Sequence, residues 1–104
     1  MAYDEDLDAM VRAAVEKDGM LRKKMFGGTC YLMGGRMVCG VWKENVILKL
    51  GEAESGKALA TGLGKVFDIT GKPMKAWIMV EGKGLTIESI ERWIESAKRF
   101  AASP

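Results

Sequence analysis

The sequence predicts an α+β domain of two layers, in which helices cover one face of a five-stranded antiparallel sheet. The glycine pair Gly34-Gly35 stands between two runs of alternating apolar residues. This pattern indicates a β-hairpin, because primed two-residue turns need positive φ angles. A polar run at 43–45 then separates this hairpin from a third apolar run at 46–50. Consecutive hairpins favour an antiparallel sheet, and the expected element order is α-β-β-β-α-β-β-α.

Three segments are expected to form helices. Apolar residues recur at helical spacing in 5–18 and again in 86–101, where Thr86 is the expected N-cap. The segment 52–61 is rich in alanine and polar residues, so it predicts a short helix that ends at Gly62.

The expected strands are short and rich in apolar residues. Residues 21–26 are an approach segment or a further short strand, and 70–74 are a turn. The strands proper are predicted at 29–33, 36–42, 46–50, 65–69 and 75–80.

Strand register follows from the two turns. A turn centred on Gly34-Gly35 sets Leu32 opposite Met37, and a turn centred on 44–45 sets Val41 opposite Leu48. Both turns place these residues on one continuous apolar face. The other face is expected to carry four candidates for a homodimer contact, because an uncovered apolar surface favours association. These candidates are Tyr31, Val38, Trp42 and Ile47.

Composition limits the domain count and the class of protein. A chain of 104 residues suits a single domain over 1–104, and its net charge of +2 gives no broad attraction to nucleic acid or membranes. No apolar run reaches the ~20 residues of a membrane span, and the acidic N-terminus is unlike a signal peptide, so we expect a cytoplasmic protein. The chain has no histidine, the commonest general base and metal ligand.

Several short motifs, in this order and spacing, resemble the N-terminal domain of the TfoX/Sxy family of competence regulators. They are the run 25–28 (Met-Phe-Gly-Gly), the apolar meander up to Leu50, Phe67, and the run 71–74 (Gly-Lys-Pro-Met) that leads to Trp77. The resemblance implies a two-layer domain similar to the secretion-chaperone folds. Full-length members also carry a C-terminal domain linked to transcriptional activation, and we expect this chain to be a stand-alone N-terminal domain.

A basic cluster, Arg22-Lys23-Lys24, precedes the meander and is the first candidate binding site. Together with Arg12, Lys17 and Arg36 it would contact phosphates in a nucleic acid. The alternative is a solvated face, since acidic residues lie nearby. Tyr31 and Trp42 are candidate stacking or interface residues.

The two cysteines offer a second candidate site. The hairpin register that aligns the core also sets Cys30 directly opposite Cys39. One hypothesis is a thiol switch. The alternative is a pair of reduced, packed side chains, because neither cysteine lies in a Cys-x-x-Cys motif and no histidine is available to activate it.

The segment 51–58 is close to the phosphate-binding P-loop pattern. Lys57 is in place, but Ala58 replaces the magnesium-binding hydroxyl residue, and Glu52 and Glu54 repel phosphate. We therefore interpret the segment as a turn followed by a weak helix.

These observations favour three functions in order. The first is a non-catalytic regulatory domain that binds another protein, in line with the family resemblance, and without a metal or cofactor. The second is a small nucleic-acid-binding protein that uses Arg22, Lys23 and Lys24. The third is a thiol-redox protein that uses Cys30 and Cys39.

Overall fold

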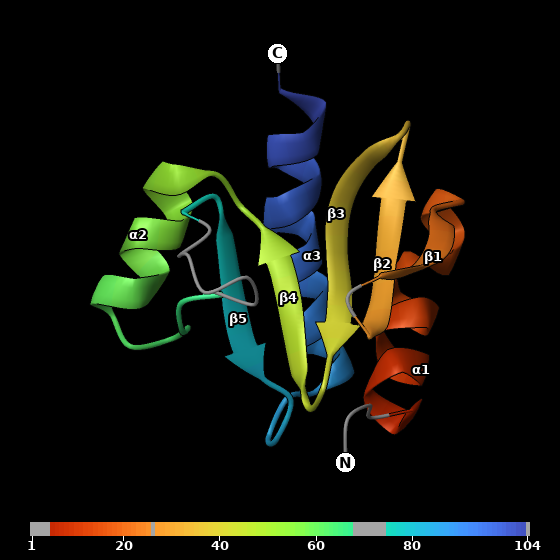
Figure 1. Ribbon diagram of the computed structural model, residues 1–104, viewed down its shortest axis with the longest axis horizontal. Helices are drawn as coiled ribbons and strands as arrows, with labels where there is room; N and C mark the ends of the chain where they lie inside the picture. Colours follow the sequence, from red (N-terminus) through yellow and green to blue (C-terminus); the bar gives the residue numbers. More distant parts are fainter. Residues whose placement is uncertain (1–4, 26, 68–74, 104) are drawn as a thin grey trace.

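The computed structural model describes residues 5–25, 27–67 and 75–103. Within these ranges one antiparallel sheet has the strand order β1-β2-β3-β4-β5 (Figure 1). Helices α1 and α3 pack together on one face of the sheet, and α2 contacts β5. The predicted α+β class is confirmed. The elements are α1 (Glu5–Val15), the 3-10 turn η1 (Glu16–Asp18), β1 (Leu21–Met25), β2 (Gly28–Met33), β3 (Arg36–Trp42), β4 (Asn45–Lys49), α2 (Glu52–Ala60), β5 (Trp77–Glu81) and α3 (Ile87–Ala102).

The expected short strand before the meander exists as β1. It forms one edge of the sheet and pairs with β2 throughout. Of the strand expected at 65–69, the described part contributes a single bridge, from Lys65 to Met79 of β5. The rest of that segment and the turn expected at 70–74 lie outside the described residues.

The main core lies between the sheet and helices α1 and α3. The amphipathic α3 faces the sheet through the stripe that the sequence indicated, and β3 and β4 supply the opposite wall. Its largest contributors, all nearly inaccessible to solvent, are Val11, Val15, Tyr31, Val38, Val41, Val46, Leu48, Ile78, Ile90 and Ile94.

A β-bulge in the first hairpin changes the predicted register. Leu32 pairs with Met37 as expected, but Val38 is an extra residue, and beyond it Tyr31 pairs with Cys39. Gly40 sits where a Cβ would clash with the carbonyl oxygen of Thr29, so the two strands approach unusually closely after the bulge. The side chains of β2, and those of Met37 and Val38 in β3, therefore point to the face opposite the predicted one. Cys39, Val41 and Trp42 keep their predicted faces.

The bulge divides the predicted apolar face between the two sides of the sheet. Tyr31 and Val38, expected on the uncovered face, are instead buried beneath the helices, so that expectation was wrong. Trp42 and Ile47 do lie on the second face, as predicted. That face has a smaller core, in which Phe67 packs between Trp42 and Trp77, with ring centroids 5.7 and 5.8 Å away.

The second turn lies one residue earlier than predicted. Trp42 pairs with Asn45, so Val41 lies opposite Val46 and Leu48 lies opposite Cys39. The pairing therefore differs by two residues from the prediction. A slip of two positions leaves each side chain on its own face, and the facing of β4 is as expected.

Both ends of α3 are fixed by side chains. At the start, the Thr86 hydroxyl accepts from the Ser89 backbone N–H and the Ser89 hydroxyl accepts from that of Thr86, each at 3.1 Å, which confirms the predicted cap. At the end, Arg36 donates to the carbonyl oxygens of Ala101 (2.8 Å) and Ser103 (2.9 Å). A cation at these carbonyls also complements the helix dipole.

Helix α2 begins at Glu52, directly after Gly51. The segment that resembled a P-loop is therefore helical where a phosphate-binding loop would need free backbone N–H groups. This confirms the interpretation as a turn followed by a helix.

Candidate functional site

A buried carboxylate is the most unusual polar group in the described structure. Asp8 is only 2% exposed although it carries a charge, because it lies on α1 next to the core residues Leu7 and Val11. Removing a carboxylate from water is costly unless it gains strong partners. Side chains from three different elements provide those partners.

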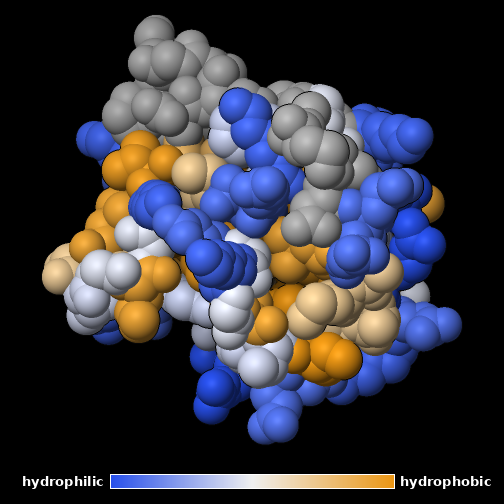
Figure 2. Space-filling model, turned by 90° about the horizontal axis from the view of Figure 1, so that it is seen from below, coloured by the Kyte–Doolittle hydropathy of each residue, from blue (hydrophilic) through white to orange (hydrophobic). Residues whose placement is uncertain are grey.

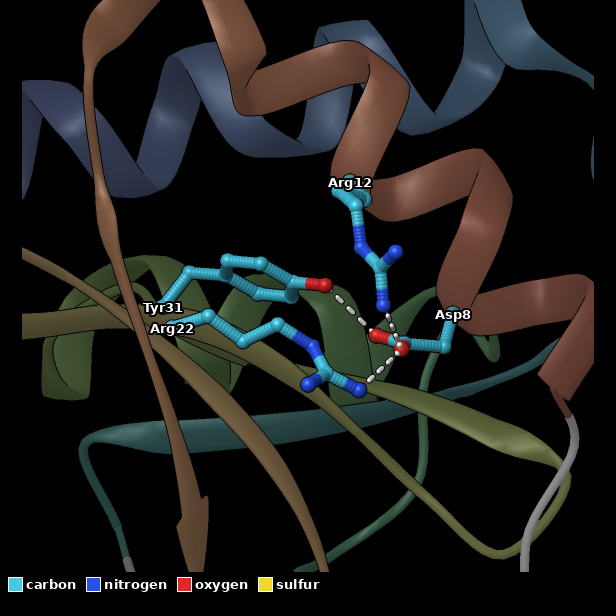
Figure 3. A network of polar contacts seen from close by, with 4 residues as sticks. All are labelled: Asp8, Arg12, Arg22 and Tyr31. Carbon is cyan, nitrogen blue, oxygen red and sulfur yellow. Dashed lines mark hydrogen bonds and ion pairs between the residues drawn. The ribbon is translucent and has the colours of Figure 1, made fainter.

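The carboxylate of Asp8 is bound on both oxygens (Figure 3). The Tyr31 hydroxyl donates to Oδ1 at 2.6 Å. Arg22 and Arg12 both donate to Oδ2, at 2.8 and 3.2 Å. The four side chains are hereafter called the Asp8 network, and they join α1, β1 and β2.

Local structure explains why these residues converge. Arg12 follows Asp8 by four residues, so the two lie on the same face of α1. Arg22 and Tyr31 are register partners in β1 and β2, so they project from the same face of the sheet toward α1. The β-bulge is essential here, because the unbulged register would turn Tyr31 away from the helix.

The network perturbs the ionisation of its members. Burial, followed by the bond to Asp8, raises the pKa of Tyr31 to about 12. The hydroxyl therefore keeps its proton, and donates a hydrogen bond, up to strongly alkaline pH. The pKa of Arg12 is raised overall. Hydrogen bonding to Tyr31 is the largest cause, and the nearby charge of Arg22 opposes it.

A cavity of about 420 Å³ opens beside the network, between α1 and β1. We call it the α1–β1 cavity. It combines the two arginines with small and apolar side chains. Its lining residues are Ala9, Arg12, Ala13, Val15, Glu16, Met20, Arg22 and Tyr31. A larger groove of about 700 Å³ runs beside α1 and α3, but its lining is dominated by charged side chains of both signs.

The predicted basic cluster is not a single surface. Arg22 points to the helix side and is held by Asp8, whereas Lys23 pairs with Cys30 and lies on the second face. Lys24, like Lys23, is exposed, and strand alternation returns it to the side of Arg22. Adjacent basic residues on a strand are thus divided between the faces of the sheet.

The cysteines are not cross-strand neighbours, which corrects the prediction. Cys30 pairs with Gly40, and Cys39 pairs with Tyr31 and Leu48. Cys39 lies in the helix-side core and Cys30 in the core of the second face, both buried. Burial raises the pKa of Cys30 to about 11 and that of Cys39 further. Both thiols are therefore poor nucleophiles at neutral pH.

The predicted aromatic candidates have different surroundings. Tyr31 is buried in the Asp8 network rather than available for stacking. Trp42 is half-buried, packs against Phe67, and holds the Lys43 ammonium 4.6 Å from its ring centroid.

An exposed apolar patch lies at the α2 side of the molecule, where Figure 2 shows apolar residues gathered on the left. It consists of Leu59, Leu63 and Val66, from the end of α2 and the segment after it, and we call it the α2-edge patch. Backbone bonds from the N–H groups of Leu63 and Gly64 to the Ala58 carbonyl hold this segment against the helix.

The described ranges lack two further kinds of feature. They hold no group of three or more Cys, Asp or Glu side chains arranged to bind a metal ion. In the same ranges, no helix is both long and apolar enough to cross a bilayer.

Sequence reasoning considered Arg12, Arg22 and Tyr31 but missed Asp8. The available signal was an acidic residue beside the apolar stripe of a helix, with an arginine four positions later. That signal marks a buried ion pair only if a partner reaches it from the sheet, and the partner depends on the bulge.

The fold and the site together define an α+β domain with an open antiparallel sheet and a buried acid–tyrosine–arginine network. A family model described as the TfoX N-terminal domain matches residues 16–101. The chain therefore belongs to the TfoX N-terminal domain family, as the resemblance indicated. Neither a curated protein nor a solved structure matches it, so the likeness to secretion chaperones stays a prediction.

Proposed function

We propose that the chain is a non-catalytic regulatory domain that acts by binding another protein, through the α2-edge patch. The single observation that carries this proposal is the exposure of three large apolar side chains within a short ordered segment. Leu59 lies in α2, the backbone of Leu63 is bonded to the last turn of that helix, and Lys65, next to Val66, is bonded to Met79 of β5. These bonds support a pre-organised surface. Clustered exposed apolar residues are typical of protein contacts.

Family membership supports the regulatory part of the proposal. The TfoX N-terminal domain is the family to which the chain belongs, and regulation of competence is the role that the resemblance implies. The cytoplasmic location expected from the sequence is part of the same proposal.

The two other functions have weaker support. The basic residues that would contact nucleic acid are divided between the two faces of the sheet. The thiols of a redox protein would have to meet, whereas Cys30 and Cys39 lie in separate cores.

A homodimer through the second face of the sheet remains a prediction. Of its four expected contacts, Trp42 and Ile47 are on that face, and Ile47 is covered. Light scattering measures whether the purified protein is a monomer or a dimer. If it is a monomer and still captures another protein, a homodimer is not needed for that binding.

The test compares two leucines of nearly equal exposure, one beside each edge of the sheet. Leu63 is 64% exposed in the α2-edge patch, and Leu21 is 66% exposed on β1. Partners captured from extract of the source cells are identified by mass spectrometry, purified, and titrated against the wild type, Leu63→Ser and Leu21→Ser.

We expect Leu63→Ser to weaken binding about tenfold or more, because it removes an apolar anchor, and Leu21→Ser to leave it unchanged. Equal affinity for all three proteins would refute the patch as the binding surface. A salt-titrated DNA-binding measurement is the companion experiment, and affinity that falls steeply with salt would favour the nucleic-acid function instead.

A further inference from the structure

The Asp8 network brings two guanidinium groups to one carboxylate. Arg12 and Arg22 contact the same oxygen, Oδ2, so the two guanidiniums are close neighbours of like charge. With the other oxygen bound by the neutral Tyr31 hydroxyl, the four side chains carry one net positive charge.

These two guanidinium groups border the α1–β1 cavity. The side chains of Arg12 and Arg22 are 56% and 35% exposed, so each guanidinium is held by Asp8 while still reaching solvent. Both line the cavity, which at about 420 Å³ is large enough for a small organic group. Planar guanidinium donors suit a carboxylate, which can accept two parallel N–H bonds.

The rest of the lining narrows the ligand class. Ala9, Ala13, Val15 and Met20 provide apolar walls that favour a short aliphatic group. Glu16 also lines the cavity and disfavours a second negative charge, such as that of a phosphate dianion. The surroundings therefore select a single negative charge attached to an apolar chain.

We propose that the α1–β1 cavity binds a carboxylate carried on a short aliphatic group, with Arg12 and Arg22 as its anion partners. Two sources supply this chemistry, a small free carboxylic acid and the C-terminus of a peptide that ends in an aliphatic residue. The proposal is independent of the α2-edge patch, which lies beyond the opposite edge of the sheet, beside β5.

The experiment is an NMR titration of the isotope-labelled full chain with four probes. The probes are 4-methylpentanoate, its carboxamide, the peptide acetyl-Ala-Leu with a free carboxylate, and the same peptide as a carboxamide. We expect the carboxylates to shift the side-chain N–H signals of Arg12 and Arg22 and the backbone signal of Met20. Each amide should bind about tenfold more weakly or not at all, because it lacks the charge.

The two carboxylates distinguish the sources. Binding of 4-methylpentanoate alone assigns the cavity to a small acid, and binding of the peptide alone assigns it to a chain terminus. Equal shifts with acids and amides would overturn the proposal, as would the absence of shifts with all four probes. Inorganic phosphate that binds as tightly as the carboxylates would overturn the assigned ligand class.

Two variants and a control test the residues. Arg12→Gln is expected to weaken carboxylate binding about tenfold, since Arg22 and Tyr31 still satisfy Asp8 and the fold is retained. Ala13→Leu fills the cavity from an exposed position of α1 and should abolish binding without touching a charge. Lys23→Gln, adjacent to Arg22 on the other face, should bind like the wild type. Unchanged affinity in both Arg12→Gln and Ala13→Leu would refute the site.

Discussion

Tyr31 donates its hydroxyl hydrogen to Asp8 at 2.6 Å, across 23 positions of the sequence. The bond joins the second strand of the sheet to the first helix inside the protein. Because the acceptor is a buried charge, this hydrogen bond belongs to the stronger class. It also depends on the bulge at Val38, which sets the side of the sheet on which Tyr31 lies.

Replacing Tyr31 by phenylalanine should therefore destabilise the protein. The variant keeps the ring in the core but leaves Oδ1 of Asp8 without its donor, and we expect a loss of about 1–3 kcal/mol in the free energy of unfolding. Urea denaturation followed by tryptophan fluorescence measures it. Asp8→Asn provides the second arm of a double-mutant cycle, and purely additive losses would contradict direct coupling between the two side chains.

The same hydroxyl predicts a weakness at alkaline pH. The pKa of Tyr31 is raised to about 12 in the folded protein from 10 in the unfolded chain, so folding favours the protonated form. Its contribution is fully present below pH 10 and is lost as the pH rises through about 12. The stability difference between the wild type and Tyr31→Phe should shrink over this range. A difference that stays constant would show that the pKa of Tyr31 is not raised.

Both thiols should be inert in the native protein. Cys30 and Cys39 are buried on different sides of the sheet, and burial raises the pKa of each. We expect neither to react with an alkylating reagent at neutral pH until denaturant is added, and no intramolecular disulfide to form on mild oxidation. Mass spectrometry of the native and denatured proteins counts the modified cysteines. An internal disulfide formed without unfolding would contradict the separation.

Two glycines should respond in opposite ways to alanine. In Gly40→Ala the new Cβ meets the carbonyl of Thr29 across the hairpin, so we expect a destabilisation of about 1–3 kcal/mol. Gly56 is inside α2 with no atom near the added Cβ, so Gly56→Ala should stabilise by about 0.5–1 kcal/mol. Thermal unfolding of both variants tests this pair, and a tolerated Gly40→Ala would contradict the close approach of β2 and β3.

The sequence predicted those features that depend on local chemistry. The turn at Gly34-Gly35 and the cap at Thr86 are encoded within a few residues, and both are confirmed. The bulge is different, because an extra residue in one strand costs little locally and is stabilised by packing on both faces. The cysteine pairing and the facing of Tyr31 failed for this one reason.

The Asp8 network could not be predicted from the sequence, for a related reason. Arg22 appears in the sequence as part of a basic run, and Asp8 as one of several acids near the N-terminus. Their pairing joins α1 to an edge strand, and it requires the helix packing, the strand order and the bulge all at once. Charge patterns along a chain do not encode contacts of this kind.

Arg36 at the start of β3 holds the carbonyl of Ala101, 65 positions later, and this contact has a consequence for synthesis on the ribosome. The hairpins of β1–β4 are local and can pair as they emerge. Their apolar face, however, lacks the cover of α3 until roughly fifty further residues are made, which takes a few seconds at about 5–20 residues per second. The nascent chain is therefore most prone to aggregation in this interval, and it becomes protected only when the last helix docks.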